Sequence, residues 1–201
     1  MKPPSSPKLP GFTHWLEQSF LKPVKSRVRQ FIYRLRYPGK INIGPRTKIS
    51  HRAILRLNGG SIEIGRSGRM SDYVMILSHG GHIQIGDNCS INPFCVINGP
   101  GGLKLGNDVR IASHTVIIPA NHAFDDLDRP IWRQTETRLG IEIGDDVWIA
   151  AGCKILDGVK IGRGCVVGAG AVVTRSLPEY SIAVGVPARI IGNRKDRLMA
   201  T

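Results

Sequence analysis

The sequence is organised around residues 141–173, which read IEIGDDVWIAAGCKILDGVKIGRGCVVGAGAVV. A branched aliphatic residue recurs there at every sixth position: Ile143, Ile149, Ile155, Ile161, Val167 and Val173. Two residues before each stands a second, usually smaller apolar residue: Ile141, Val147, Cys153, Val159, Cys165 and Ala171. A period of six would visit every face of an α-helix, but it suits short strands that bend every six residues. Such fixed self-similarity predicts a β-solenoid whose coils bury their apolar faces against one another.

The same pattern extends toward the N-terminus. An aliphatic residue followed by glycine marks each predicted coil: Ile43-Gly44, Ile64-Gly65, Ile85-Gly86, Leu105-Gly106, Ile143-Gly144 and Ile161-Gly162. The gaps between these marks are 21, 21, 20, 38 and 18 residues. Three strands of six residues account for 18, so one coil carries an insertion of 20 residues, at 121–140. A long insertion in a tight repeat is usually functional, and we expect a loop that projects from a corner.

Three motifs in order make the chain similar to a known family. Residues 143–152 (IGDDVWIAAG), 166–174 (VVGAGAVVT) and 185–189 (GVPAR) resemble the hexapeptide-repeat acyltransferases, most closely the sugar, maltose and xenobiotic-type O-acetyltransferases. The resemblance covers roughly residues 41–193. It implies an all-β fold, a left-handed parallel β-helix of about six coils.

Three regions are expected along the chain. Residues 1–40 combine a disordered start with a basic amphipathic helical segment, weak at 13–21 and firmer at 23–36. Residues 41–182 form the β-helix, and 183–201 form a C-terminal extension that ends in a short basic tail. The N-terminal helix is expected to pack its apolar stripe across the open first coil, because solenoids need a cap, or to pack within a trimer. Binding of its basic face to anionic lipid is a compatible alternative.

The charge is concentrated near the N-terminus. The chain carries a formal net charge of +13, and residues 1–40 hold nine Lys/Arg against one acidic residue. This favours an anionic partner such as a membrane surface or a polyanionic glycan. Nucleic acid is disfavoured, because no DNA-reading or RNA-binding motif accompanies the charge. Without a secretory signal or a long apolar run, the expected location is the cytoplasm, with peripheral contact at the inner face of the cell membrane.

The cysteines and histidines do not have the spacing of a metal site. Cys89, Cys95, Cys153 and Cys165 all occupy the inward position two residues before a six-spaced aliphatic, so we expect buried, inert thiols. Metal-binding hexapeptide proteins of the gamma-class carbonic anhydrase type have two histidines five residues apart, whereas His114 and His122 are eight apart. No metal is expected.

The resemblance implies that His122, at the start of the insertion, is the catalytic base. A sugar hydroxyl attacks a thioester only as its proton is removed, and histidine titrates near the required pH. Asp125 or a main-chain carbonyl is expected to orient the ring. The acceptor is expected to meet Asn121, Asp125 and Trp132 in the loop. Asn92 is a further acceptor candidate, although Phe94 stands where some maltose-type relatives carry a functional asparagine.

The donor side of the resemblance involves small residues and cations. Pantetheine-binding turns of the family match Ala151 and Ala169, where small side chains let a thin arm approach the backbone. Trp148 matches an aromatic beside the donor cleft, and Arg175, Arg189 and Lys195 are candidates for the phosphates of coenzyme A. The family forms homotrimers with active sites between subunits.

These expectations combine into one leading function and two alternatives. The leading hypothesis is an acetyl-CoA-dependent O-acetyltransferase that acts on a sugar hydroxyl during bacterial polysaccharide or glycolipid synthesis, by direct transfer and without an acyl-enzyme. The alternatives are an N-acyltransferase of an amino sugar and a non-catalytic β-helix binding or scaffold protein.

Overall fold

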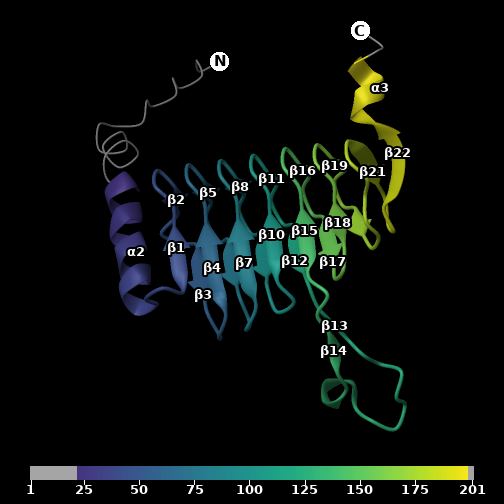
Figure 1. Cartoon of the computed structure of the whole chain (residues 1–201), viewed down its shortest axis with the longest axis horizontal. Helices are drawn as coiled ribbons and strands as arrows, with labels where there is room; N and C mark the ends of the chain where they lie inside the picture. Colours follow the sequence, from purple (N-terminus) through teal and green to yellow (C-terminus); the bar gives the residue numbers. More distant parts are fainter. Residues whose placement is uncertain (1–21, 199–201) are drawn as a thin grey trace, which may run out of the picture.

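The computed structural model describes residues 22–198, and it describes the side chains of residues 27–196. The expected disordered start at 1–11, the weak helical segment at 13–21 and the last three residues of the tail lie outside the described residues. Between the helix α2 (Lys22–Arg36) and the short C-terminal helix α3 (Arg194–Leu198), the chain winds as a solenoid of short parallel strands (Figure 1).

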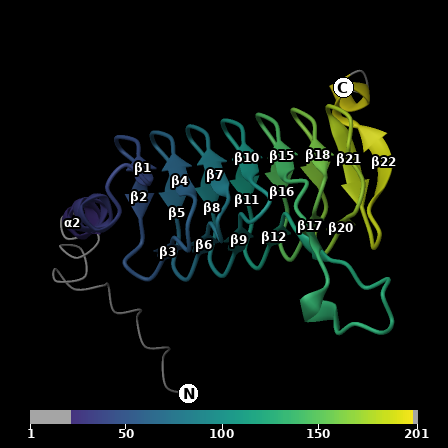
Figure 2. The same cartoon turned by 60° about the horizontal axis from the view of Figure 1, so that its bottom comes forward.

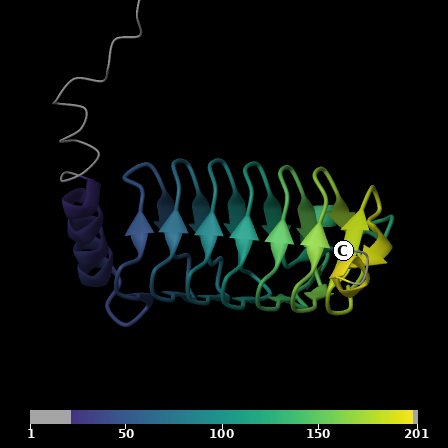
Figure 3. The same ribbon diagram turned by 90° about the horizontal axis from the view of Figure 1, so that it is seen from above.

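The strands line up in three long faces, which Figure 3 shows from above. Within each face, neighbouring strands run parallel, except for the last pair, β21 and β22. Face A contains β1 (Ile41–Ile43), β4 (Ser61–Ile64), β7 (His82–Ile85), β10 (Leu103–Leu105), β15 (Ile141–Ile143) and β18 (Lys160–Ile161). Face B contains β2 (Lys48–Ile49), β5 (Arg69–Met70), β8 (Ser90–Ile91), β11 (Arg110–Ile111), β16 (Trp148–Ile149), β19 (Val166–Val167), β21 (Ser181–Val184) and β22 (Arg189–Asn193). Face C contains β3 (Ile54–Arg56), β6 (Met75–Leu77), β9 (Val96–Asn98), β12 (Val116–Ile118), β17 (Lys154–Leu156) and β20 (Val172–Val173).

The aliphatic rows that the sequence marks are the core. In face A, Ile41, Ile62, Ile83, Leu103 and Ile141 are partners in successive strands, and each is at most 3% exposed. The strand between two such rows alternates inward and outward side chains, as the period of two requires. The predicted left-handed parallel β-helix of about six coils is therefore confirmed.

Close packing of the coils explains the aliphatic-glycine marks. The chain turns directly after each mark, where the backbones of neighbouring coils lie close together. A Cβ on Gly86 would lie 2.4 Å from the carbonyl oxygen of Gly106 in the next coil. Any larger residue would have to push the coils apart, so glycine is required by the stacking itself.

Helix α2 covers the first coil with its polar side. The first coil has no preceding strand, so several of its carbonyl groups need donors. Gln30 donates to the carbonyl of Thr47 at 2.7 Å and Arg34 to that of Ile43 at 2.9 Å. Arg29 donates to the carbonyls of His51 and Ala53.

The apolar stripe of the helix does not pack on the solenoid, so that expectation is wrong. Val28, Phe31, Ile32 and Leu35 are between 52% and 74% exposed, whereas Tyr33 on the opposite side is 8% exposed. The first coil needed hydrogen-bond donors more than apolar cover, because its interior is already filled by its own aliphatic residues. Within residues 22–198, no helix is long and apolar enough to cross a bilayer.

An antiparallel hairpin closes the other end of the solenoid. Strands β21 and β22 pair with each other at the end of face B, and Leu177 makes one bridge to Ile161 on face A. Arg194 then donates to Asp146 at 3.0 Å, which fixes the start of α3 against an earlier coil.

All four cysteines are buried core residues, as predicted. Their exposed fractions are 0% or 1%, and each thiol donates to a main-chain carbonyl. Burial raises the pKa of the Cys89 thiol to about 11 and raises the pKa of Cys153 as well. A thiol in this state is a poor nucleophile near neutral pH.

Candidate functional site

Three corners join the faces and give the site its geometry. The AB, BC and CA corners each follow a strand of the first-named face, once per coil. The insertion 121–140 leaves the CA corner after β12 and returns before β15, and it projects away from the solenoid (Figure 2).

The insertion is an ordered hairpin rather than an irregular loop. Strands β13 (Asn121–His122) and β14 (Glu136–Thr137) pair antiparallel at its base, and the 3-10 helix η2 (Ile131–Arg133) lies near its tip. The Asp157 carboxylate in the next coil accepts hydrogen bonds from the Thr137 hydroxyl at 3.0 Å and the Gly140 amide at 2.9 Å. Asp157 therefore anchors the returning strand. The sequence analysis did not single out Asp157, whose only signal is its place at the equivalent corner of the next coil.

Glu136, rather than Asp125, faces the candidate base. The antiparallel pairing places His122 opposite Glu136, and His122 Nε2 lies 3.6 Å from Glu136 Oε1. Glu136 also pairs with Arg138 at 3.0 Å. Asp125 lies beyond the paired part of the hairpin, and its role in orienting the ring stays a prediction. Glu136 had no clear signal in the sequence, since the pairing depends on how the insertion folds back.

The expected acceptor residues occupy two different regions. Asn121 lies beside His122 in β13, whereas Asp125 and Trp132 lie toward the exposed tip, where the Arg133 guanidinium is 4.8 Å from the Trp132 ring centroid. Asn92 lies at the BC corner, on a different edge of the prism, and its amide donates to the Ile111 carbonyl at 3.0 Å. The hairpin residues and Asn92 are not brought together within one chain.

The BC corner is bare in the last two coils. Ala151 and Ala169 are exposed there, and each is followed by a glycine with a left-handed backbone: Gly152 has φ 73° and Gly170 has φ 71°. A Cβ on Gly170 would meet no atom within 4 Å. The predicted donor turns thus form an open, flat edge on which a thin chain can lie close to the backbone.

The donor candidates outside these turns are spread over the molecule. Residues 185–188 pair with Val172, which brings Arg189 at the start of β22 close to the BC corner. Trp148 projects from the adjoining face B and is 53% exposed. Arg175 follows β20, toward the CA corner, and Lys195 lies 4.4 Å from the ring centroid of Tyr180 on the AB side. Arg189 and Trp148 are therefore the candidates that lie near the donor turns.

An aromatic ladder occupies the same BC corner in the earlier coils. Tyr73 and Phe94 stack with ring centroids 5.1 Å apart, and Phe94 and His114 stack at the same distance. All three residues have the left-handed backbone that Gly152 and Gly170 have in later coils. The ladder therefore ends where the bare part of the corner begins. The sequence analysis noted Phe94 but missed the ladder, because the unequal coil lengths conceal the common register.

The histidine and acidic side chains of the described residues do not gather into a metal site. Among residues 22–198, no group of three or more His, Cys, Asp or Glu side chains is placed to hold a metal ion. His82 instead hydrogen-bonds the Ser61 hydroxyl through Nδ1 at 2.7 Å.

Comparisons with known proteins agree with this geometry. Residues 140–175 match the family described as "Bacterial transferase hexapeptide (six repeats)". A probable acetyltransferase of Mycobacterium tuberculosis is 39% identical over 100 residues, which are 50% of this chain and 33% of that protein. A putative lipopolysaccharide biosynthesis O-acetyl transferase of Escherichia coli is 34% identical over 108 residues, 50% of this chain and 55% of that protein. The chain thus matches about a third to a half of the length of these relatives.

A solved structure covers more of the fold. A point mutant of AntD, an N-acyltransferase from Bacillus cereus, in complex with dTDP-4-amino-4,6-dideoxyglucose and coenzyme A, superimposes with a TM-score of 0.71 at 28% sequence identity. The similarity covers 84% of this chain and 92% of AntD. The predicted resemblance is therefore confirmed: residues 140–175 match the hexapeptide transferase family, and the chain is similar in sequence to acetyltransferases and in fold to an N-acyltransferase.

Proposed function

We propose that the protein is an acetyl-CoA-dependent O-acetyltransferase that acts on a hydroxyl of a sugar in bacterial polysaccharide or glycolipid biosynthesis. One observation carries the proposal: a histidine backed by a carboxylate projects from one edge of face C, and an open edge of small residues suited to a pantetheine arm forms the other. The similarity to a lipopolysaccharide O-acetyl transferase supports the acceptor class and the hydroxyl as nucleophile.

His122 would act as the general base of a direct transfer. Its Nε2 faces Glu136, so Nδ1 is the nitrogen that would take the proton of the acceptor hydroxyl. The hydroxyl oxygen forms a bond to the acetyl carbonyl carbon, and the carbon–sulfur bond of the thioester then breaks. The imidazolium returns the proton to the departing thiolate. Glu136 would stabilise the positive charge that His122 carries between these two steps.

The BC corner would hold both substrates. The pantetheine arm would lie along Ala151 and Ala169, with Trp148 beside it and Arg189 toward the phosphates. The stacked rings of Phe94 and His114 end next to these turns and offer a flat surface to the apolar face of a sugar ring. Catalytic cysteine chemistry does not enter, because the Cys153 side chain is buried on the inner side of the same corner.

We infer that a homotrimer brings the two edges together. General-base catalysis needs His122 within hydrogen-bond reach of the acceptor, yet its hairpin leaves the CA corner while the donor turns lie at the BC corner. If the hairpin of one subunit meets the BC corner of its neighbour, each interface contains one complete site. This arrangement is a cyclic, head-to-tail interface, which closes into a ring.

Mixing subunits that are each defective in a different half of the site tests this arrangement. One partner would carry His122→Ala, and the other Ala151→Leu with Ala169→Leu. The His122→Ala homotrimer should be nearly inactive, and the homotrimer of the other variant should turn over only with a raised KM for acetyl-CoA. Refolding an equal mixture should give about a quarter of the interfaces the wild-type KM, as random assembly in a cyclic trimer predicts. Mixing without subunit exchange is the control. A refolded mixture that turns over acetyl-CoA only with the raised KM, although mass spectrometry shows mixed trimers, would place both halves of the site in one chain.

The alternative of N-acylation has its own support in AntD, an N-acyltransferase. Paired acceptors that differ only in a hydroxyl or an amine at one sugar carbon distinguish the two reactions. We expect mass spectrometry to show faster acetylation of the hydroxyl member. Preference for the amine would establish the alternative, and absence of acetyl-CoA turnover with every acceptor and with water would favour a scaffold.

The remaining part of the proposal concerns location. We place the enzyme in the cytoplasm, with peripheral contact at the inner face of the cell membrane. The basic N-terminal region and the exposed apolar side of α2 support this placement.

A further inference from the structure

The exposed side of α2 is a continuous apolar stripe. Val28, Phe31, Ile32 and Leu35 are spaced by three, one and three residues, which places them on one side of a helix with 100° per residue. Phe31 is 67% and Leu35 74% exposed. The side of the helix that contacts the solenoid carries Arg29, Gln30, Tyr33 and Arg34 instead. The stripe therefore faces away from the solenoid.

Cations flank the stripe on both sides. At 100° per residue, Arg27 borders the side of Phe31 and Arg36 borders the side of Ile32. Both are exposed, and α2 has no acidic residue anywhere in its sequence. A helix with an apolar stripe flanked by an arginine on each side fits a helix that lies in the interface of a bilayer.

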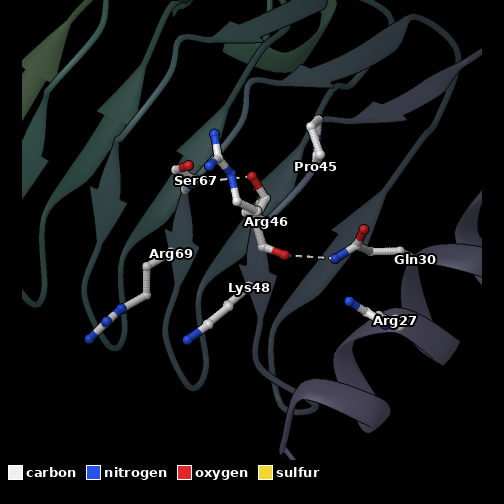
Figure 4. Close-up of a pocket in the computed structure, with 9 residues that line it drawn as sticks. Arg27, Gln30, Pro45, Arg46, Lys48, Ser67 and Arg69 are labelled. Carbon is white, nitrogen blue, oxygen red and sulfur yellow. Dashed lines mark hydrogen bonds between the residues drawn. The ribbon is translucent and has the colours of Figure 1, made fainter.

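A basic pocket adjoins the helix on the side of Arg27. It has a volume of about 650 Å³ and lies between α2 and the first two coils (Figure 4). Lys48 and Arg69 point the same way from neighbouring strands β2 and β5, and Arg27 lies beside them on the helix. Arg46 also lines the pocket, with its side chain turned toward Ser67. Among the described residues, no acidic side chain lines it.

The concentration of positive charge in this pocket is not general to the solenoid surface. On face A, the outward positions carry charges of both signs, and Lys160 pairs with Glu142 at 3.0 Å. On face B, the corresponding positions in coils 1, 2 and 4 are Lys48, Arg69 and Arg110, with no acid among them. No carboxylate of residues 22–198 forms an ion pair with Arg27, Lys48 or Arg69.

We propose that α2 and this pocket form a docking site for an anionic phospholipid bilayer, in which the stripe enters the interface and Arg27, Lys48 and Arg69 bind lipid phosphate. The apolar part alone would suit many occupants, but the flanking and adjoining cations select an anionic one. A second copy of this chain fits poorly, because two stripes in contact would bring two basic surfaces together. The proposal rests on the membrane contact of the proposed function and assigns it to named residues, but it does not depend on the acyl transfer.

Vesicle binding by the full-length chain tests the proposal. Vesicles of phosphatidylcholine alone and of phosphatidylcholine with an equal part of phosphatidylglycerol would be sedimented with the protein at low and high salt. We expect binding to the phosphatidylglycerol vesicles that weakens as salt rises, and little binding to phosphatidylcholine alone. Failure to bind anionic vesicles at low salt would overturn the proposal. The stripe would then have another occupant, such as residues 1–21 or a second copy of the chain.

Two double variants separate the contributions of charge and stripe. Lys48→Gln with Arg69→Gln should weaken vesicle binding about 25-fold, since each cation near an anionic leaflet contributes about fivefold. Phe31→Gln with Leu35→Gln should weaken it by about tenfold or more, through lost burial in the interface. All four side chains are exposed, so thermal unfolding should be unchanged.

Matched controls alter the same chemistry elsewhere. Arg56→Gln with Lys104→Gln removes two exposed strand cations from faces C and A, and Leu127→Gln with Ile190→Gln removes two exposed apolar residues far from α2. Both should bind vesicles as the wild type does. Equal losses in the controls and the test variants would overturn the proposal.

Inorganic pyrophosphate distinguishes a lipid site from a site for soluble anions. Under the proposal, millimolar pyrophosphate lowers vesicle binding only as much as sodium sulfate of the same ionic strength. Tight pyrophosphate binding that survives in the stripe variant, together with complete release from vesicles, would assign the pocket to a soluble phosphate ligand instead.

Discussion

The two corners that border face C are built from the same repeat but differ in what they present. The BC corner of the last two coils carries only Ala151, Gly152, Ala169 and Gly170 at its surface, and it stays close to the backbone. The CA corner of coil 4 instead extends into a hairpin that carries His122 and Glu136. The BC corner thus exposes main chain with only small side chains, whereas the CA corner carries titratable side chains on a projecting hairpin.

This difference shows how a solenoid separates binding from chemistry. A bare corner can follow an extended substrate over several coils, because equivalent main-chain groups recur at each strand spacing. A reacting group needs a single position, and one insertion in one coil supplies it. The two are then combined between subunits, where the corner of one chain can meet the hairpin of another.

Removal of the base should have the largest effect. His122→Ala should lower kcat by about 10²–10⁴-fold, the usual contribution of a general base, while acetyl-CoA affinity changes little. Steady-state kinetics and a coenzyme A binding titration measure the two quantities. A variant that keeps more than half of wild-type turnover would remove His122 from the reaction.

Larger side chains at the BC corner should weaken binding of the acetyl donor without changing the base. Ala151→Leu with Ala169→Leu would place bulk where the pantetheine arm lies, and overpacking costs about 1–3 kcal/mol. The KM for acetyl-CoA should therefore rise about 5- to 100-fold. Asn42→Leu, an exposed position on face A, is the control for added bulk. An unchanged KM would show that the donor binds elsewhere.

Neutralising the partner of the base should have a smaller effect. The His122–Glu136 pair is partly exposed, with 54% and 31% of the side chains accessible, so it contributes at most about 1 kcal/mol. Glu136→Gln should lower kcat about fivefold with little change in KM. Asp125→Asn should have no such effect, and the reverse result would restore Asp125 as the orienting residue.

The buried thiol at the donor corner should matter least to catalysis. Cys153→Ala should keep activity within about twofold, because a buried, protonated thiol offers no nucleophile. A folded but inactive variant would indicate an acyl-cysteine intermediate.

The same thiol should influence stability at high pH. Burial raises the pKa of Cys153 above its ordinary value of 9.0 in the folded protein only. Its contribution to stability is therefore complete below pH 9.0 and is lost as the pH rises above it, since the unfolded thiol ionises first. Denaturant unfolding on both sides of that pH should show a smaller loss for Cys153→Ala than for the wild type.

The features that could be predicted from the sequence are those that repeat locally along the chain. The rows of Ile, Leu and Val and the buried cysteines follow from strand alternation repeated every six residues, which is a local property. The extent of the insertion follows from the coil length. The helix at the N-terminus follows from its periodicity, but the side it presents does not.

What the sequence alone determined is the coil, its core and the position of His122 along the chain. Only the tertiary structure decided that Glu136 faces His122, because that contact depends on how the insertion pairs with itself. The aromatic ladder required the register of coils of unequal length. The orientation of α2 was decided by the unpaired carbonyls of the first coil, which drew Arg29, Gln30 and Arg34 inward and left the apolar stripe outside. In each case the deciding partner is distant in sequence, so no local pattern could identify it.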